Sequence, residues 1–169
     1  VSAVARVYEP GCKVDTMPIL VGPQGARKST VLRLLAMEGR WFSDSHIDFN
    51  YGIKDAYQSL RGVWIYEVAE LDGITRAKEM STVKAFISSS EDRFRPSYGR
   101  NIVSRPRQTL LCGSTNESGF LRDATGSRRF WPIKVGTIDA DGLKAAVPML
   151  WGEAVQWYRG GERWHLSTE

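Results

Sequence analysis

Short apolar runs alternate along the chain with segments whose apolar residues recur at helical spacing. The runs have the length and the β-branched or aromatic content of buried strands, and they span residues 17–21, 63–66, 109–114 and 130–135. The segments with helical spacing span residues 28–37, 54–60, 77–88 and 141–158. Because buried strands that alternate with helices favour parallel pairing, we expect an α/β fold with a largely parallel sheet flanked by helices.

Two prolines and one arginine-rich stretch modify the strands and helices that this pattern predicts. Pro132 cannot donate a hydrogen bond to a neighbouring strand, which favours an edge position for the last strand. Pro148 lies inside the last helical segment and predicts a kink there. Between residues 89 and 107 the regular spacing fails and arginines accumulate, so we expect an irregular segment.

Length and composition indicate one ordinary globular domain. The chain has 169 residues, of which 42% are hydrophobic and 25% are charged. We expect a single domain over residues 1–169 and, because the chain begins with Val1, a piece of a longer protein. No apolar stretch approaches the roughly 20 residues that span a bilayer, and no signal-peptide pattern is present. These features favour a cytoplasmic location and no membrane partner.

Charge and cysteine content narrow the chemistry only slightly. The net charge of +4 permits an anionic partner without requiring one. Cys12 and Cys112 are the only cysteines and neither lies in a Cys/His cluster, so neither a zinc site nor a disulfide framework is expected. Cys112 lies in an apolar run and is typical of a small buried hydrophobe.

A glycine-rich turn joins the first strand to the first helix and has the form of a phosphate loop, GxxxxGK[ST]. The backbone N–H groups of such a loop and the helix N-terminus that follows cradle phosphates. Lys28 is expected to reach the β- and γ-phosphates of ATP, and Ser29 to supply a hydroxyl to Mg²⁺. The residues predicted to bind the nucleotide are Gly22, Pro23, Gln24, Gly25, Ala26, Arg27, Lys28, Ser29 and Thr30.

Arg27 departs from the phosphate-loop pattern, which has glycine before the lysine. Glycine suits a loop that needs a positive φ or a close approach of backbone to ligand. An arginine in the left-handed conformation costs on the order of 1 kcal/mol and adds bulk. An extra cation beside a polyphosphate partly offsets this cost. The simpler alternative is a glycine-rich turn that caps a helix and binds no ligand.

The second predicted strand ends in carboxylates, which a parallel sheet would place beside the phosphate loop. Residues 63–70 read Val-Trp-Ile-Tyr-Glu-Val-Ala-Glu, the arrangement of a Walker B strand. Hydrolysis needs one carboxylate to hold Mg²⁺ with its waters and another to orient the attacking water. We assign Glu67 to the metal and Glu70 to the water. The two roles can be exchanged, and Glu70 is also typical of a solvated helix start.

Polar residues follow the third predicted strand and precede the fourth. Asn116 stands where ring ATPases place a polar residue that contacts the γ-phosphate or water, and an asparagine in a turn is the alternative. Arg128 and Arg129 suit an arginine finger, since a guanidinium stabilises charge on a transferring phosphoryl group. Surface arginines beside a strand are the alternative. The predicted catalytic residues are Lys28, Glu67, Glu70, Asn116, Arg128 and Arg129.

The arginine-rich segment over residues 91–107 suggests contact with nucleic acid. Guanidinium groups bind phosphates and aromatic rings stack on bases, and the segment interleaves arginines with Phe94 and Tyr98. A solvated basic loop, or a contact to an acidic neighbouring subunit, is an almost equal alternative. The residues predicted to contact nucleic acid are Arg93, Arg95, Tyr98, Arg100, Arg105 and Arg107.

In this order the motifs resemble those of the virulence-associated protein E family. The resemblance extends over roughly residues 10–166 and rests on residues 21–30, 64–71, 83–86, 95–100, 115–116 and 120–131. Members of the family are P-loop proteins of phages, plasmids and genomic islands, related to superfamily 3 helicases and to the helicase halves of primase-helicases. The resemblance implies a P-loop NTPase fold of the AAA+/superfamily 3 type. It also implies a homo-oligomeric ring, with Arg128 or Arg129 acting from a neighbouring subunit, and an upstream primase-like region.

These observations support three hypotheses about function. The leading one is an ATP-binding and ATP-hydrolysing, helicase-like motor domain that acts on DNA, expected to be single-stranded, in the replication of phages or mobile elements. ATP and Mg²⁺ are its expected cofactors. The second is a degenerate module that binds nucleotide or nucleic acid without turnover, which Arg27 motivates. The third is a small-molecule kinase, against which the arginine-rich segment and the lack of an evident acceptor or lid motif count.

Overall fold

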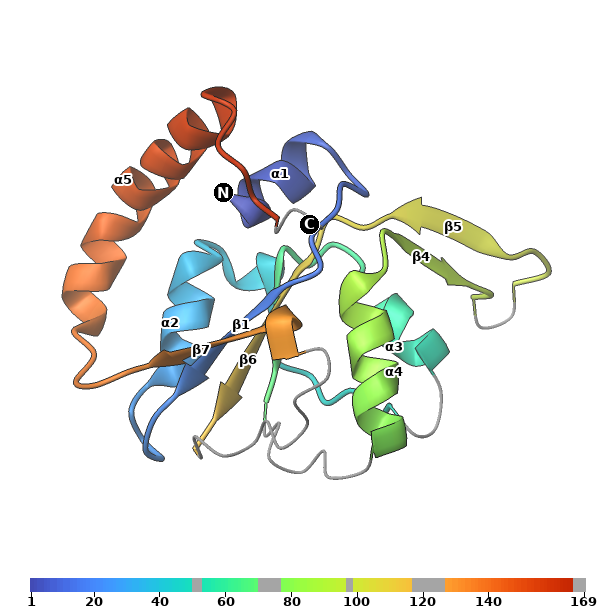
Figure 1. The fold of residues 1–169 in the computed structure, drawn as a ribbon, viewed down its shortest axis with the longest axis horizontal. Coiled ribbons are helices and arrows are strands. Elements are labelled where there is room, and N and C mark those ends of the chain that lie inside the picture. Colours follow the sequence, from blue (N-terminus) through green and yellow to red (C-terminus); the bar gives the residue numbers. More distant parts are fainter. Residues whose placement is uncertain (50–52, 70–76, 97–98, 117–126, 166–169) are drawn as a thin grey trace.

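A computed structural model describes residues 1–49, 53–69, 77–96, 99–116 and 127–165, in which helices cover both faces of one sheet (Figure 1). The helices are α1 (Ser2–Tyr8), α2 (Lys28–Leu35), α3 (Ile53–Ser59), α4 (Ala77–Ser88) and α5 (Ala140–Arg159), with 3₁₀ turns η1 (Gly39–Trp41) and η3 (Ser127–Arg129). The strands are β1 (Met17–Val21), β2 (Phe42–Ser43), β3 (Ile65–Val68), β4 (Glu91–Phe94), β5 (Val103–Pro106), β6 (Leu110–Thr115) and β7 (Phe130–Lys134).

The main sheet has five parallel strands in the order β2-β3-β6-β1-β7. Strand β1 therefore lies between β6 and β7, although both follow it late in the sequence. This arrangement confirms the expected α/β fold with a largely parallel sheet. Strand β7 is at one edge, as Pro132 predicted, because a residue without an N–H weakens a strand that must pair on both sides.

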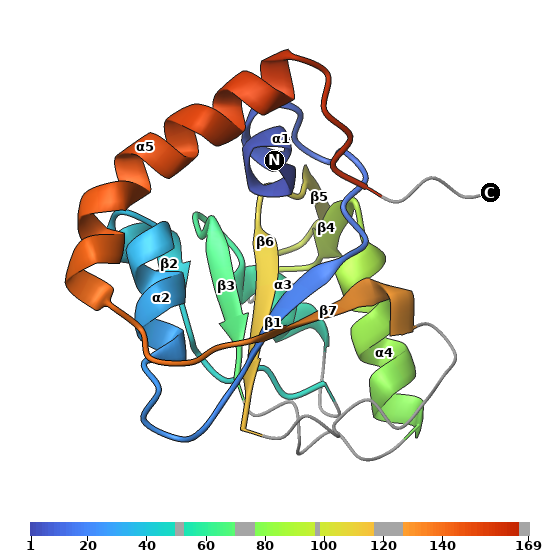
Figure 2. The same ribbon diagram turned by 60° about the vertical axis from the view of Figure 1, so that its left-hand side comes forward.

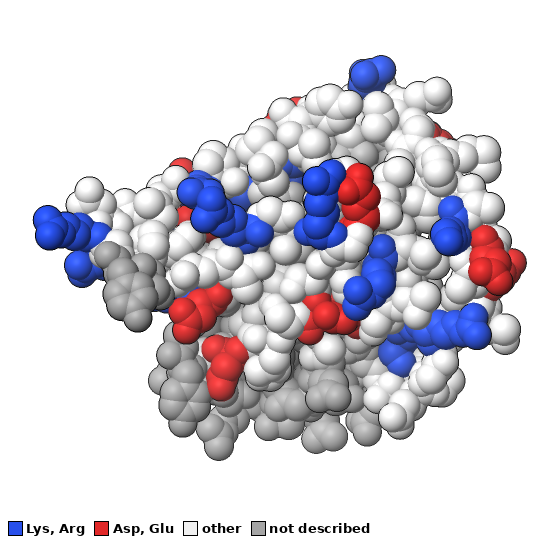
Figure 3. Space-filling model, turned by 180° about the vertical axis from the view of Figure 1, so that it is seen from behind, with Lys and Arg blue, Asp and Glu red and all other residues white. Residues whose placement is uncertain are grey.

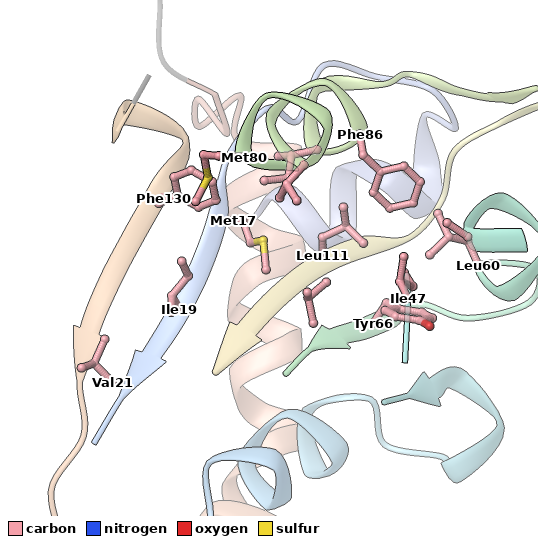
Figure 4. Packing of buried hydrophobic residues seen from close by; sticks show 14 residues of the cluster. Met17, Ile19, Val21, Ile47, Leu60, Tyr66, Met80, Phe86, Leu111 and Phe130 are labelled. Carbon is pink, nitrogen blue, oxygen red and sulfur yellow. The ribbon is translucent and has the colours of Figure 1, made fainter. Parts of the chain in front are cut away.

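One face of the sheet packs against α3 and α4 (Figures 2 and 4). Alternate strand residues point to the same face, and most of those on this face are apolar. They include Met17, Ile19 and Val21 of β1, which pack in one cluster with Phe86 of α4. A strand that is buried on both faces has a continuous apolar sequence. Short apolar runs of this kind identified β1 and β6.

The opposite face packs against α2, and α5 lies beyond α2 on the same side (Figure 2). Leu20 and Ile65 point to this face and form a second cluster with Leu32 of α2. Trp151 of α5 packs at a tilt against Trp64 with ring centroids 4.5 Å apart, and its Nε1 donates a hydrogen bond of 2.8 Å to the Leu35 carbonyl. Helix α5 continues through Pro148 as a single element.

Strands β4 and β5 form an antiparallel hairpin that projects from the body of the domain (Figure 1). The sequence pattern predicted an irregular segment here, and that prediction is wrong. Pairing of Asp92 with Arg105 and of Phe94 with Val103 supplies the regularity. Apart from Phe94 and Val103 the two strands consist of polar residues and a proline, so they lack an alternating apolar face. Two further short elements, α1 and β2, were also not predicted.

Arg107 lies at the base of this hairpin and is 1% exposed. Its Nε donates a hydrogen bond of 2.8 Å to Asp92 Oδ1, its Nη1 bonds the Phe86 carbonyl, and its guanidinium lies 4.5 Å from the Phe86 ring centroid. Burial raises the pKa of Asp92, and the adjacent Arg107 charge opposes that rise. Arg107 thus ties the hairpin to the end of α4 and is not accessible to nucleic acid, which corrects its predicted role.

We expect Arg107→Ala to lower the free energy of unfolding by about 3–5 kcal/mol, because it leaves the buried Asp92 carboxylate without its cation. Arg105→Ala is the matched control, since Arg105 is exposed on the same hairpin, and it should change stability by less than about 0.5 kcal/mol. Urea unfolding measures both as shifts of the midpoint at constant slope. Equal stability of the two variants would contradict the buried ion pair.

Candidate functional site

Polar side chains from three neighbouring strands meet at one edge of the main sheet. Strands β1, β3 and β6 are parallel and adjacent, so their carboxyl ends lie together. The loop of residues 22–27 leaves β1 at this edge and leads into α2, whose N-terminal residues are Lys28 and Ser29. The edge therefore combines a helix N-terminus with the strand ends that carry Glu67 and Asn116.

Two positions in the loop of residues 22–27 limit which side chains the chain can carry there. A Cβ on Gly22 would lie 2.7 Å from Val135 Cγ2 and 3.0 Å from the Val135 carbonyl oxygen, so no larger residue fits without movement of the chain after β7. Gly25 has φ +80°. Both glycines are thus needed for the backbone path, one for close approach and one for a left-handed conformation.

Arg27 is the residue immediately before α2 and adopts the left-handed conformation, with φ 61° and ψ 28°. This is the conformation that glycine favours at the corresponding position of a phosphate loop. The arginine therefore keeps the backbone path of the loop and accepts the conformational cost. Its side chain is exposed, so the bulk it adds lies towards solvent.

Lys28 is 8% exposed, and its Nζ donates three hydrogen bonds. Two of them go to loop carbonyls, of Gly22 at 2.7 Å and of Pro23 at 3.0 Å. The third goes to Asn116 Oδ1 at 2.9 Å, across 88 residues of sequence. The ammonium thus links the loop to the end of β6, and each of its N–H donors faces an oxygen acceptor.

Glu67 is 1% exposed on β3, and its Oε1 accepts two hydroxyl hydrogen bonds. Ser29 Oγ donates at 2.8 Å and Ser114 Oγ donates at 2.6 Å. Its Oε2 is buried and has no hydrogen-bond partner among the described residues. An unpartnered buried carboxylate oxygen is costly, and such an atom in a folded protein usually marks a place for water or an ion.

Cys112 lies beside Glu67, in register with it on β6. Burial, and to a lesser degree the Glu67 charge, raise the pKa of this thiol to about 12. Cys112 therefore stays a neutral thiol at physiological pH and adds no second negative charge next to the carboxylate. The structure confirms the expected buried position of this cysteine.

Ser114 is the site residue that the sequence analysis missed. It lies on β6 two residues before Asn116, so the two positions share a face of the strand, as do Cys112 and Ser114. The spacing from Asn116 was readable in the sequence. The pairing with Glu67 depends on the β3–β6 register, which no local pattern reveals.

The other residues predicted for nucleotide binding or catalysis differ in their placement. Gln24 and Thr30 are exposed and Ala26 is half-buried, all at or beside the loop. Arg129 Nε donates a hydrogen bond of 2.9 Å to Ser88 Oγ at the end of α4, whereas the Arg128 side chain is exposed. Glu70 lies outside the described residues. Arg129 is therefore engaged within its own chain, whereas Arg128 is open to solvent.

The exposed arginines predicted to contact nucleic acid lie on and around the hairpin: Arg93, Arg95, Arg100 and Arg105. Arg95 Nε donates a hydrogen bond of 2.8 Å to the Gly99 carbonyl. In Figure 3 basic side chains lie at the projecting end of the domain, while basic and acidic side chains are interspersed over the rest of that face. Tyr98 lies outside the described residues.

A pocket of about 780 Å³ lies elsewhere, at the opposite edge of the sheet from the loop of residues 22–27. It is mostly apolar and is lined by side chains of α1, of α5 and of the chain before β3 and β6, including Tyr8, Trp64 and Trp151. None of the polar side chains that converge at the loop lines it. This pocket is therefore separate from the polar side chains at the loop of residues 22–27.

The fold and the site define an α/β domain that brings polar groups of adjacent parallel strands to a glycine-rich loop. The model of the virulence-associated protein E-like domain family matches residues 1–169, and the chain belongs to this family. The match confirms the resemblance drawn from the ordered motifs. No curated protein matches the chain significantly.

Solved structures with the same fold include apo forms of the NrS-1 C terminal region. One, of residues 305–718, is 15% identical to this chain, covers 86% of this chain and 38% of its own, and has a TM-score of 0.61. Two A-form apo structures are 15% and 14% identical, cover 86% of this chain and 37% and 38% of their own, and have TM-scores of 0.56 and 0.60. At these identities the likeness shows the fold, and this chain spans well under half of each structure.

Two kinds of feature are absent from the described residues. No helix among them is long and apolar enough to cross a membrane. No cluster of three or more His, Cys, Asp or Glu side chains among them is arranged to hold a metal ion by itself.

The left-handed conformation of Arg27 predicts an unusual order of stability. Arg27→Gly and Arg27→Ala both remove the side chain, but alanine retains the left-handed strain, so the glycine variant should be more stable by about 0.5–1 kcal/mol. At Met37, which has φ 65°, the glycine variant should likewise be more stable than the alanine variant. At the exposed Ala145 of α5 the order should reverse, so that Ala145→Gly lowers stability. Denaturant unfolding measures each pair. An alanine variant at least as stable as Arg27→Gly would contradict the observed backbone conformation.

Proposed function

We propose that this domain binds ATP with Mg²⁺ at the loop of residues 22–30 and hydrolyses it, as the helicase-like motor of an assembly that acts on DNA. The observation that carries the proposal is the convergence of Lys28, Ser29, Glu67 and Asn116 at one edge of the sheet. Lys28 and Asn116 are 88 residues apart in sequence, and Ser29 and Glu67 are 38 apart. A lysine, a hydroxyl, a carboxylate and an amide beside a helix N-terminus are the groups that phosphoryl transfer uses.

The donor set suits Mg²⁺ in particular. Magnesium keeps several waters and takes only one or two protein ligands when it binds with phosphates, so a hydroxyl and one buried carboxylate are enough. Glu67 Oε2, which lacks a partner among the described residues, is the oxygen available to a bound cation or its water. When bound, Mg²⁺ neutralises charge on the β- and γ-phosphate oxygens.

Each of the converging side chains has a distinct part in the proposed reaction. Lys28 exchanges the carbonyls of Gly22 and Pro23 for phosphate oxygens, which bear more negative charge. Asn116 orients the γ-phosphate or the attacking water, and Glu67 or Glu70 orients that water by accepting its hydrogen bond. The water oxygen bonds to the γ-phosphorus as the bond to the bridging oxygen breaks, which yields ADP, inorganic phosphate and a proton.

The partners follow from the remaining arginines. Arg128 is exposed next to the edge strand β7, where it can reach the nucleotide of a neighbouring subunit in a homo-oligomeric ring. The exposed arginines of the hairpin are suited to DNA phosphates, and single-stranded DNA leaves bases free for aromatic stacking. Membership of the virulence-associated protein E-like family supports a role in the replication of phages or mobile elements.

The proposal predicts Mg²⁺-dependent ATP binding that requires Lys28. Titration with a fluorescent ATP analogue should show binding in Mg²⁺ that weakens in EDTA, and Lys28→Ala should weaken the Mg²⁺-dependent binding at least tenfold, because the ammonium loses its phosphate contacts. Lys144→Ala, at an exposed position of α5, is the matched control and should bind like the parent. Parent and Lys28→Ala proteins with equal affinities would remove the loop from the proposed mechanism.

A second candidate function is a module that binds nucleotide or DNA without turnover, and Arg27 is the observation that favours it. DNA-stimulated phosphate release distinguishes the two. If the arginine blocks catalysis, Arg27→Gly should raise turnover at least tenfold over the parent. If the parent is itself an active ATPase, its turnover should already exceed that of the Lys28→Ala variant. A parent and an Arg27→Gly variant that both lack turnover in every state of assembly would exclude the motor.

A further inference from the structure

Two hydroxyl groups bind the same oxygen of Glu67, and they are not equivalent. Ser29 and Ser114 both donate to Oε1, at 2.8 Å and 2.6 Å. A hydroxyl donor to a carboxylate at such distances forms a strong, charge-assisted hydrogen bond. The Ser29 side chain is at the exposed start of α2, beside Lys28, whereas Ser114 is buried inside β6.

The backbone places Ser114 beside Glu67 whether or not the loop changes. In the parallel β3–β6 pair, Glu67 is in register with Cys112, and Ser114 is two residues further along the same face. Pairing with β3 as far as Gly113, and with β1 from Gly113 to Thr115, holds this part of β6. Ser29, by contrast, belongs to the loop–helix junction that must receive a ligand.

In the proposed reaction a lone pair of the Ser29 oxygen would bind the metal while its O–H still donates to Glu67, so Ser29 would serve both groups. Ser114 has no such second task, and its hydrogen bond to Oε1 limits rotation of the carboxylate whatever Ser29 does. Ser114 is the remaining donor to Oε1 among the described residues. While it holds Oε1, Oε2 stays the oxygen that can meet a cation or its water.

We propose that Ser114 is a positioning residue that fixes the Glu67 carboxylate, so that its orientation does not depend on Ser29, which also serves Mg²⁺. This inference rests on the proposed ATP-binding function. Ser114 acts through Glu67 and has no contact with the substrate of its own. The competing explanation is that the hydroxyl merely satisfies its own hydrogen bond inside a buried strand.

Thr109 provides a matched control for that competing explanation. It is buried immediately before β6, and its hydroxyl donates to the carbonyls of Leu60 and Val63 at the opposite end of the strand. Thr109→Val removes a buried hydroxyl with little change of shape, far from Glu67. Its effect reports what the loss of a structural hydroxyl does to activity.

The experiment compares the parent with Ser114→Ala, Ser114→Thr and Thr109→Val. Each is measured for kcat and KM of ATP hydrolysis and for the Mg²⁺ concentration that gives half-maximal binding of a fluorescent ATP analogue. Ser114→Ala should lower kcat at least tenfold with KM for ATP changed less than threefold, and should raise the half-maximal Mg²⁺ concentration at least threefold. Ser114→Thr should restore both, since it returns the hydroxyl, and Thr109→Val should leave both near the parent.

The outcomes separate this inference from the proposed function. A parent that binds ATP without turnover still tests Ser114 through the Mg²⁺ dependence of binding. If Ser114→Ala matches the parent in kcat and in Mg²⁺ dependence, or if Thr109→Val loses as much as Ser114→Ala, the positioning role is overturned and the proposed function stands. If the parent binds no ATP with or without Mg²⁺, the proposed function fails, and the role of Ser114 fails with it.

Discussion

A buried carboxylate between two strands and a helix N-terminus is the constraint around which the candidate site is organised. Glu67 is removed from water on β3, and one of its oxygens receives hydroxyl donors from α2 and from β6. Burying a charge costs several kcal/mol, so its remaining oxygen is a strong acceptor for a cation. The positions of α2, β3 and β6 are thereby tied to one side chain. Burial, and to a lesser degree the Glu67 charge, raise the pKa of the adjacent Cys112 thiol and keep it neutral.

Local conformational strain is concentrated in the loop beside Glu67. Lys28 is buried among carbonyl and amide oxygens, Arg27 holds a left-handed conformation, and Gly22 meets the chain after β7 with no room for a Cβ. Such local strain is typical of sites where the backbone must approach a ligand. Arg27 replaces the usual glycine without a change of backbone path, because it adopts the left-handed conformation and its side chain is exposed.

Some arginines of the hairpin region are buried and stabilise the fold, and others are exposed and give the surface positive charge. Arg107 is enclosed by Asp92 and Phe86, and Arg6 of α1 donates hydrogen bonds to the Arg107 and Ser89 carbonyls, so both hold the base of the hairpin to α4 and α1. Arg93, Arg95, Arg100 and Arg105 remain exposed. Arg129 contacts Ser88 at the end of α4 as well, which brings the start of β7 and the base of the hairpin to the same helix end.

The sequence by itself determined the alternation of strands and helices, the parallel sheet with β7 at its edge, and the turn that leads into α2. Those features follow from the local spacing of apolar residues, prolines and glycines, which can be recognised without knowledge of any tertiary contact. The hairpin, the burial of Arg107 and the bond from Ser114 to Glu67 were decided only by the tertiary structure. Each depends on which residues become neighbours across strands or between helix and hairpin. Arg105 and Arg107 are two positions apart, and only packing decides that one is exposed and the other enclosed.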